Sequence, residues 1–80
     1  MFSFKKRATI DIHGMTVRQA EVELTKRISL LPDDIEQVVV VHGFNRGNAL
    51  MNFVRNEFRH PRIYKISFTD NYGETVLELI

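Results

Sequence analysis

The sequence predicts a small α/β domain with the element order βαβαββ, and three observations carry this prediction. Two apolar runs, residues 10–12 and 39–41, each end in a His-Gly pair. A segment with helical periodicity follows each pair, and two segments of alternating apolar residues follow near the C-terminus. The spacing of about 30 residues between the first two runs is typical of a right-handed βαβ unit.

The first strand is predicted over residues 8–12. Because side chains alternate along a strand, Ile10 and Ile12 share the core face. Asp11 and His13 are then neighbours on the other face. The chain therefore places a carboxylate beside an imidazole at the end of this strand.

The first helix is predicted over about residues 16–31. Thr16 and Gln19 match a capping box at its start, and Pro32 ends the apolar periodicity. Residues 37–41 contain four consecutive valines, which favours a strand in the middle of a sheet.

The second half of the chain predicts one more helix and two more strands. The helix covers about residues 48–59, before His60 and Pro61. A strand over residues 63–68 alternates, and a last strand over residues 75–80 follows turn residues. The apolar stripe expected on the helix is Leu50, Phe53, Val54 and Phe58, and the side chains expected on one face of the third strand are Tyr64, Ile66 and Phe68.

Length and composition indicate one small globular domain over residues 1–80. A chain of 80 residues buries a modest core, so we expect a monomer or a weak homodimer. The absence of cysteine excludes a disulfide framework and thiolate metal sites. Residues 1–7 lack a signal-peptide pattern and are expected to form a flexible arm. No run is long enough to span a membrane, so we expect a cytoplasmic protein.

The charges are unevenly distributed although the formal net charge is only +1. Between His42 and Lys65 the chain carries five cations and a single carboxylate, Glu57. This pattern fits a basic side suited to nucleic acid, and it fits slightly better a set of solvated charges around two helices. The sequence leaves both interpretations open.

The ends of the first two strands are expected to form one crevice. In parallel α/β units the carboxyl ends of strands and the amino ends of helices meet, which predicts that Asp11, His13 and His42 converge with Thr16. Helix amino ends favour phosphate, and a loop flanked by glycines lets its backbone approach such a group. A phosphodiester is therefore the predicted guest, with Arg46 as a further contact.

Two histidines and a carboxylate fit general acid–base cleavage of that phosphodiester, with Asp11 orienting His13 or acting as the base. Three alternatives stay open: a structural role, phosphate binding without catalysis, and a zinc or iron site formed by Asp11, His13 and His42. Phe44 either stacks on a base or packs over the crevice. His60 is expected to complement a helix dipole.

The chain also resembles a known family, the Smr (small MutS-related) domains. Residues 10–14, IDIHG, are similar to the LDxHG motif of the family, and residues 42–47, HGFNRG, to its HGxGxG motif. Residues 73–79, GETVLEL, are similar to the common closing strand, so the resemblance covers about residues 9–79. Asn45 replaces the middle glycine, and Arg46 replaces a small residue.

The resemblance implies a two-layer α+β sandwich similar to the C-terminal domain of translation initiation factor three. Its four-stranded mixed sheet carries both helices on one face. The resemblance also implies a function directed at DNA or RNA, because family members occur in MutS-like and RNA-processing proteins and several nick DNA or cleave RNA. We expect nucleic-acid binding, with endonuclease activity through Asp11, His13 and His42. The expected phosphate-binding residues are Gly14, Thr16, Gly43, Phe44, Asn45, Arg46 and Gly47.

The runner-up function is a non-catalytic adaptor that recognises a ribosomal, RNA or protein partner through the same surface. No cofactor is required by the sequence, and a divalent metal remains an open option. The replacements at Asn45 and Arg46 favour binding over cleavage.

Overall fold

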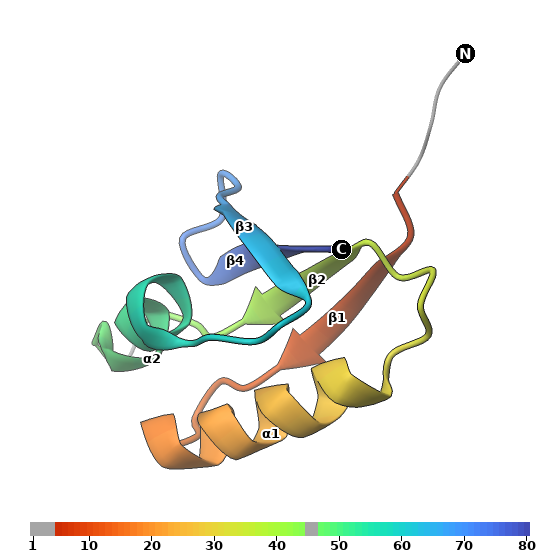
Figure 1. Cartoon of the computed structure of the whole chain (residues 1–80). Coiled ribbons are helices and arrows are strands. Elements are labelled where there is room, and N and C mark those ends of the chain that lie inside the picture. The colour runs from red at the N-terminus through yellow and green to blue at the C-terminus, as the bar shows by residue number, and fades with distance from the viewer. Residues whose placement is uncertain (1–4, 45–46) are drawn as a thin grey trace.

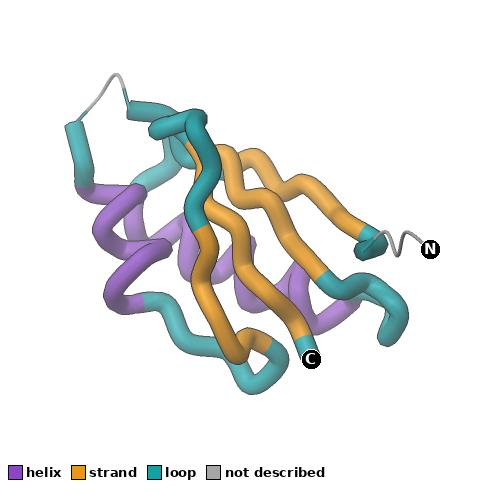
Figure 2. The backbone as a smooth tube through the Cα atoms, turned by 90° about the horizontal axis from the view of Figure 1, so that it is seen from above, coloured by secondary structure: helices purple, strands orange, loops and turns teal. Residues whose placement is uncertain are grey.

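The computed structural model describes residues 5–44 and 47–80, and it confirms the α+β class and the predicted element order (Figure 1). Two helical segments cover one face of a four-stranded mixed sheet and leave the other face open (Figure 2). The elements are β1 (Arg7–Asp11), α1 (Val17–Leu30), β2 (Gln37–Val41), α2 (Ala49–Asn52), the π-helical turn η1 (Phe53–Glu57), β3 (Ile63–Ser67) and β4 (Glu74–Leu79).

The strand order is β1-β2-β4-β3. β1 and β2 are parallel, and β4 pairs antiparallel with both β2 and β3. The carboxyl ends of β1 and β2 therefore lie at the same edge as the start of β4, which brings the two His-Gly pairs together as predicted. The likeness to the translation factor domain stays a prediction.

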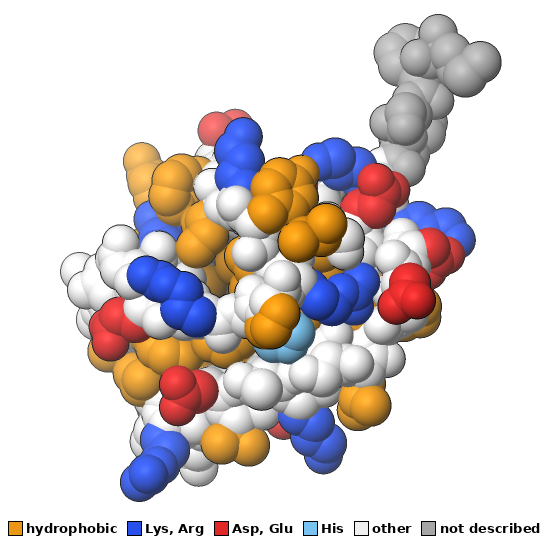
Figure 3. Space-filling model, in the orientation of Figure 1, with side chains coloured by type: hydrophobic (Ala, Val, Ile, Leu, Met, Phe, Trp, Pro, Cys, Tyr) orange, Lys and Arg blue, Asp and Glu red, His pale blue; other side chains and the backbone are white. Residues whose placement is uncertain are grey.

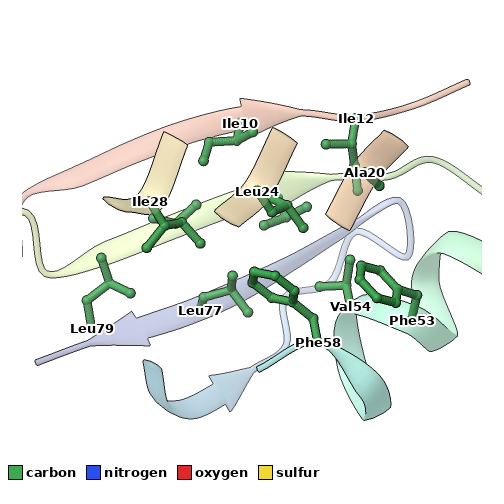
Figure 4. Close-up of a cluster of buried hydrophobic side chains, with 12 residues drawn as sticks. Ile10, Ile12, Ala20, Leu24, Ile28, Phe53, Val54, Phe58, Leu77 and Leu79 are labelled. Carbon is green, nitrogen blue, oxygen red and sulfur yellow. The ribbon is translucent and has the colours of Figure 1, made fainter. Parts of the chain in front are cut away.

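The core lies between the sheet and the helices (Figure 4). Ile10 and Ile12 are almost fully buried, which confirms the expected alternation in the first strand. The rings of Phe53 and Phe58 are also buried, with centroids 5.7 Å apart, so they belong to the core as predicted. The remaining buried apolar side chains of the cluster are Ala20, Leu24, Ile28, Val38, Val40, Val54, Leu77 and Leu79.

The second helix differs from the prediction in length and type. It ends at Glu57 rather than near residue 59, and its second half is a π-helical turn. The Phe58 N–H donates to the carbonyl of Phe53, five residues earlier, at 2.8 Å. This wider turn lets both phenylalanine rings face the core, a requirement that simple helical periodicity does not reveal.

The third strand also differs, because a register shift interrupts β3 between Ile63 and Lys65. One extra residue in the strand changes which side chains share a face. Ile63 and Ile66 pack against the core, whereas Tyr64 is exposed. The prediction that Tyr64 shares a face with Ile66 is therefore wrong.

The predicted flexible arm does not extend to residues 5–7. The Lys6 carbonyl accepts hydrogen bonds from the N–H groups of Glu36 and Gln37. Lys5 Nζ lies 3.0 Å from a carboxylate oxygen of Glu78 on the open face of the sheet. Residues 1–4 lie outside the described residues. Within the described chain, no helix has the length and apolar character needed to cross a bilayer.

Arg62 closes the C-terminal end of α1. Its guanidinium donates to four carbonyl oxygens at distances of 3.1–3.3 Å. A helix end leaves its last carbonyls without partners, and a cation there complements the helix dipole. Arg62 is thus committed to the fold rather than to a basic binding face. The four acceptors belong to Ile28, Leu31, Pro32 and Ile35.

His60 does not complement a helix dipole as expected, because its hydrogen bonds fit a neutral ring. Its Nδ1 accepts from the backbone N–H of Arg62 at 3.1 Å, and its Nε2 lies 3.1 Å from Ser29 Oγ, which itself donates to the Thr25 carbonyl. The tautomer with its hydrogen on Nε2 satisfies this series of hydrogen bonds. Burial, followed by the charge of Arg62, lowers the pKa of His60 from its ordinary value.

We predict that Arg62→Met lowers the free energy of unfolding by about 2 kcal/mol, because charge-assisted hydrogen bonds to helix carbonyls are lost. Arg59→Met is the matched control, since within residues 5–44 and 47–80 Arg59 donates to one carbonyl, that of the adjacent Phe58. Urea denaturation measures both variants. Equal stability of Arg62→Met and wild type would show that the guanidinium does not cap α1.

We further predict that stability falls as pH drops below about 6.5, the ordinary pKa of histidine. The pKa of His60 is lower in the folded chain, so the unfolded chain binds more protons in this range and protonation favours unfolding. His60→Gln should reduce this slope while keeping a donor and an acceptor. Denaturation midpoints at several pH values test this, and an unchanged slope in the variant would contradict it.

Candidate functional site

Asp11 and His13 form a contact at the end of β1. The His13 ring donates from Nδ1 to Asp11 Oδ1 at 2.5 Å, and the His13 backbone N–H donates to the same oxygen at 3.0 Å. These two bonds, led by the ring bond, lower the pKa of Asp11. Both side chains are more than half exposed. The carboxylate therefore orients the imidazole and directs its Nε2 away from Asp11.

His42 has a different environment at the end of β2. The side chain is buried, with 4% of its surface exposed. Its Nδ1 lies 2.9 Å from the Gly43 carbonyl oxygen, and its Nε2 lies 2.9 Å from Thr75 Oγ1. Arg55 Nε donates to the same hydroxyl at 2.8 Å.

These contacts define one chain of hydrogen bonds. Because a carbonyl only accepts, His42 Nδ1 carries the hydrogen and donates to Gly43. With its hydrogen on Nδ1 the ring accepts at Nε2, so the Thr75 hydroxyl donates to His42 Nε2 while its oxygen accepts from Arg55 Nε. Both ring nitrogens of His42 are then occupied by neighbours within the fold.

The loop after β2 is attached to the start of β4. The backbone N–H groups of His42 and Gly43 both donate to the Gly73 carbonyl at 2.9 Å. Gly43 has φ of 74°, a conformation that favours glycine. A Cβ built on Gly43 would lie 3.7 Å from His13 Cβ, so the two His-Gly loops lie side by side.

A pocket of about 430 Å³ opens between these loops and the start of α2. It brings together six residues predicted for the site: His13, Gly14, His42, Gly43, Phe44 and Gly47. Val41, Ala49 and Leu50 supply apolar walls. Asn45 and Arg46, also predicted for the site, lie outside the described residues.

Thr16 has the role in the fold that its capping box predicted. Its Oγ1 accepts from the Gln19 backbone N–H at 3.1 Å, and the Gln19 side chain accepts from the Thr16 N–H at 2.9 Å. The hydroxyl is thus engaged at the start of α1. Thr16 is not among the side chains that line the pocket.

The basic side suggested by the charge pattern is only partly available. Arg62 caps α1, and Arg55 donates to Thr75 and to the Glu74 carbonyl. Arg59 and Lys65 line a separate groove at the edge of β3. The four cations that the structure describes from His42 to Lys65 are therefore divided between structural bonds and a separate groove.

The proposed three-residue metal site has no support in the donor geometry. In residues 5–44 and 47–80, no three His, Cys, Asp or Glu side chains gather closely enough to hold a metal ion. Both nitrogens of His42 are also engaged in hydrogen bonds. Asp11, His13 and His42 thus do not form a ligand set.

Sequence reasoning missed Arg55, Thr75 and Gly73. Thr75 is a polar residue on the buried face of the last strand, and that position is the one local signal for a hydrogen bond to a buried partner. Arg55 gave no such signal, because it reaches Thr75 through the π-helical turn.

This chain is similar to proteins of one known family. A family model described as Smr domain matches residues 10–73. The crystal structure of the Smr domain of Thermus thermophilus MutS2 is similar to this chain with a TM-score of 0.80 and 22% sequence identity. The match covers 91% of this chain and 98% of that one. No curated protein matched the sequence significantly.

We predict that Thr75→Val lowers the free energy of unfolding by about 2 kcal/mol, because it leaves His42 Nε2 and Arg55 Nε without their shared partner. Thr75→Ser keeps the hydroxyl and is the matched control. Urea denaturation of the three proteins provides the comparison. If Thr75→Val is no less stable than Thr75→Ser, the hydrogen-bond chain does not stabilise the fold.

Proposed function

This chain belongs to the Smr domain family, and from that premise we propose that it binds nucleic acid at the pocket between its two His-Gly loops. Smr domains generally bind nucleic acid. The single observation that carries the proposal here is the exposed His13 ring, oriented by Asp11 beside Gly43 and Phe44, the described start of the loop after β2, which we call the glycine loop. A phosphodiester in this pocket contacts His13 Nε2 and the backbone of Gly43 and Phe44.

The same geometry supports cleavage by His13 as a general base and then a general acid. Neutral His13 accepts at Nε2 the proton of an attacking hydroxyl or water as its oxygen bonds to phosphorus. The negative charge of Asp11 stabilises the resulting imidazolium. The bond from phosphorus to the leaving oxygen then breaks, and the imidazolium returns the proton to that oxygen.

His42 takes a positioning role in this proposal. A two-histidine mechanism requires a second ring nitrogen at the phosphodiester, whereas both nitrogens of His42 bond to Gly43 and Thr75. We assign His42 to holding the glycine loop against β4. This role replaces the proton transfer expected from the sequence.

The hydrogen bonds of both His42 ring nitrogens also favour a second candidate function, which is nucleic-acid binding without cleavage. In that case the same pocket recognises the phosphodiester, and Asp11 and His13 supply a hydrogen bond only. The two candidates differ in one measurable property, because binding without cleavage leaves the oligonucleotide intact under every metal and pH condition.

We predict that His13→Ala reduces cleavage of DNA or RNA by about 10²- to 10⁴-fold, the usual contribution of a general acid–base group, and weakens binding much less, because only one contact to the phosphodiester is lost. Asp11→Asn should reduce cleavage in the same direction. His60→Gln is the matched histidine control and should cleave normally. The assay uses purified protein on single-stranded, duplex and branched DNA and on structured RNA, with and without divalent metal.

One outcome would contradict cleavage alone, and another would contradict both candidates. Cleavage by His13→Ala at the wild-type rate contradicts the catalytic role. An affinity that does not fall as salt rises contradicts phosphate binding and therefore the proposed function itself, because phosphate contacts release counterions.

A further inference from the structure

Exposed aromatic rings gather at the end of the molecule that carries the pocket. In the described part of the chain four aromatic side chains are exposed, and three of them are in this region: Phe44 (59%), Phe68 (64%) and Tyr72 (75%). Phe44 follows the second His-Gly pair, and the other two lie in residues 68–73, which join β3 to β4 and which we call the β3–β4 turn. We call these three residues the aromatic platform. Clustered exposed rings indicate a contact surface.

The platform is contiguous with the pocket. Phe44 lines the pocket together with His13. A Cβ built on Gly73 would lie 3.3 Å from Phe44 Cδ1, so the ring of Phe44 packs against the residue that follows Tyr72. A ligand at His13 that extends past Phe44 therefore reaches the β3–β4 turn.

Hydrogen bonds hold this turn in one conformation. The Gly73 N–H donates to Asn71 Oδ1 at 2.8 Å, and the Asn71 N–H donates to Thr69 Oγ1 at 3.1 Å. The turn is also attached to the glycine loop through the Gly73 carbonyl. Rings presented by ordered loops lose little conformational entropy when a ligand binds.

Arg55 adds a planar cation to the platform. Its guanidinium lies 4.6 Å from the centroid of the Phe68 ring. Bonds to Thr75 Oγ1 and to the Glu74 carbonyl hold it there. Nucleobases stack on aromatic rings and beside arginine side chains regardless of their sequence. Figure 3 shows hydrophobic side chains gathered beside the β3–β4 turn, with basic side chains near them.

The carboxylates around the turn favour contact with the bases of a nucleic acid over contact with its phosphates. Asp70 and Glu74 are carboxylates on this turn and strand start, and Glu74 Oε1 accepts from Thr69 Oγ1. They repel a phosphate backbone, so the contact at the platform is made by base faces. In a duplex those faces are stacked on each other, whereas unpaired bases offer them freely.

We propose that the aromatic platform stacks the bases of an unpaired nucleic-acid segment whose phosphodiester lies at His13. This proposal rests on the proposed function and names its substrate class, single-stranded DNA or RNA. Phe44 and Tyr72 bind bases next to the pocket, and the Phe68–Arg55 pair binds a base further along the strand.

The test measures the affinity of the whole chain for a short fluorescent single strand and for its duplex across a salt series. Phe44→Ala and Tyr72→Ala should each weaken single-strand binding by about 5- to 150-fold, the loss expected for one stacked base. The slope of log affinity against log salt should not change, because stacking releases no phosphate counterions. Val22→Ala and Leu30→Ala are matched controls, since both side chains are exposed on α1.

A second readout reports stacking directly. The chain has no tryptophan and two tyrosines, so Tyr64→Phe leaves Tyr72 as the sole tyrosine. A single strand should quench its fluorescence, and an abasic strand of equal length should not. Such a result would show bases at Tyr72 even if an alanine variant failed to fold.

Three results would overturn the proposal. The first is that Phe44→Ala and Tyr72→Ala bind the single strand as tightly as wild type does, while wild-type binding still depends on salt. That result leaves the proposed function intact. The second is an equal loss of duplex binding in these variants. The third is self-association of the wild type that disappears in them, which assigns the platform to a second copy of the chain. If wild type binds no nucleic acid at all, that result would instead contradict the proposed function.

Discussion

Two backbone hydrogen bonds to one carbonyl hold the site in place. The Gly73 oxygen accepts from the N–H groups of both His42 and Gly43, and this joins the loop after β2 to the start of β4. The position of the glycine loop beside His13 follows from that attachment. Gly73 itself is tightly enclosed, because a Cβ there would lie 3.2–3.5 Å from Asn71, Phe44 and Gly43. A larger residue at this position would require the side chains of Asn71 and Phe44 to shift.

The two His-Gly pairs look equivalent in sequence and are different in structure. At the end of β1, Asp11 occupies one nitrogen of His13 and the ring is exposed. At the end of β2, the Thr75 hydroxyl and the Gly43 carbonyl occupy both nitrogens of His42. One imidazole is thus available to a ligand, and the other stabilises the loop that forms the pocket. In the proposed function, proton transfer is therefore assigned to His13.

Local signals explain what could be predicted from the sequence. The capping box at Thr16, the valine run of β2 and the alternation around Ile10 each act within a few residues, and the structure confirms all three. The parallel pairing of β1 and β2 then brings both histidines to one edge. Arg62 and the π-helical turn were not predictable in the same way, because their partners lie far away in the chain or depend on core packing.

The site shows the same division between local and distant contacts. The Asp11–His13 contact spans two residues and follows from strand geometry. The state of His42 depends on Thr75, 33 residues later in the chain, and on Arg55 beyond it. An alternating apolar pattern places Thr75 on a buried face but does not say which side chain it meets. Long-range hydrogen bonds of this kind decide which histidine is available.

The most direct test of the difference between His13 and His42 is nitrogen NMR of the imidazole rings at neutral pH, with and without a short oligonucleotide. We predict that the His42 ring carries its hydrogen on Nδ1 and accepts a hydrogen bond at Nε2, and that its signals stay in place when the oligonucleotide is added. The signals of His13 should shift in the same experiment. A shift of the His42 ring nitrogens with an unchanged His13 would contradict the assignment of His13 as the histidine that contacts nucleic acid.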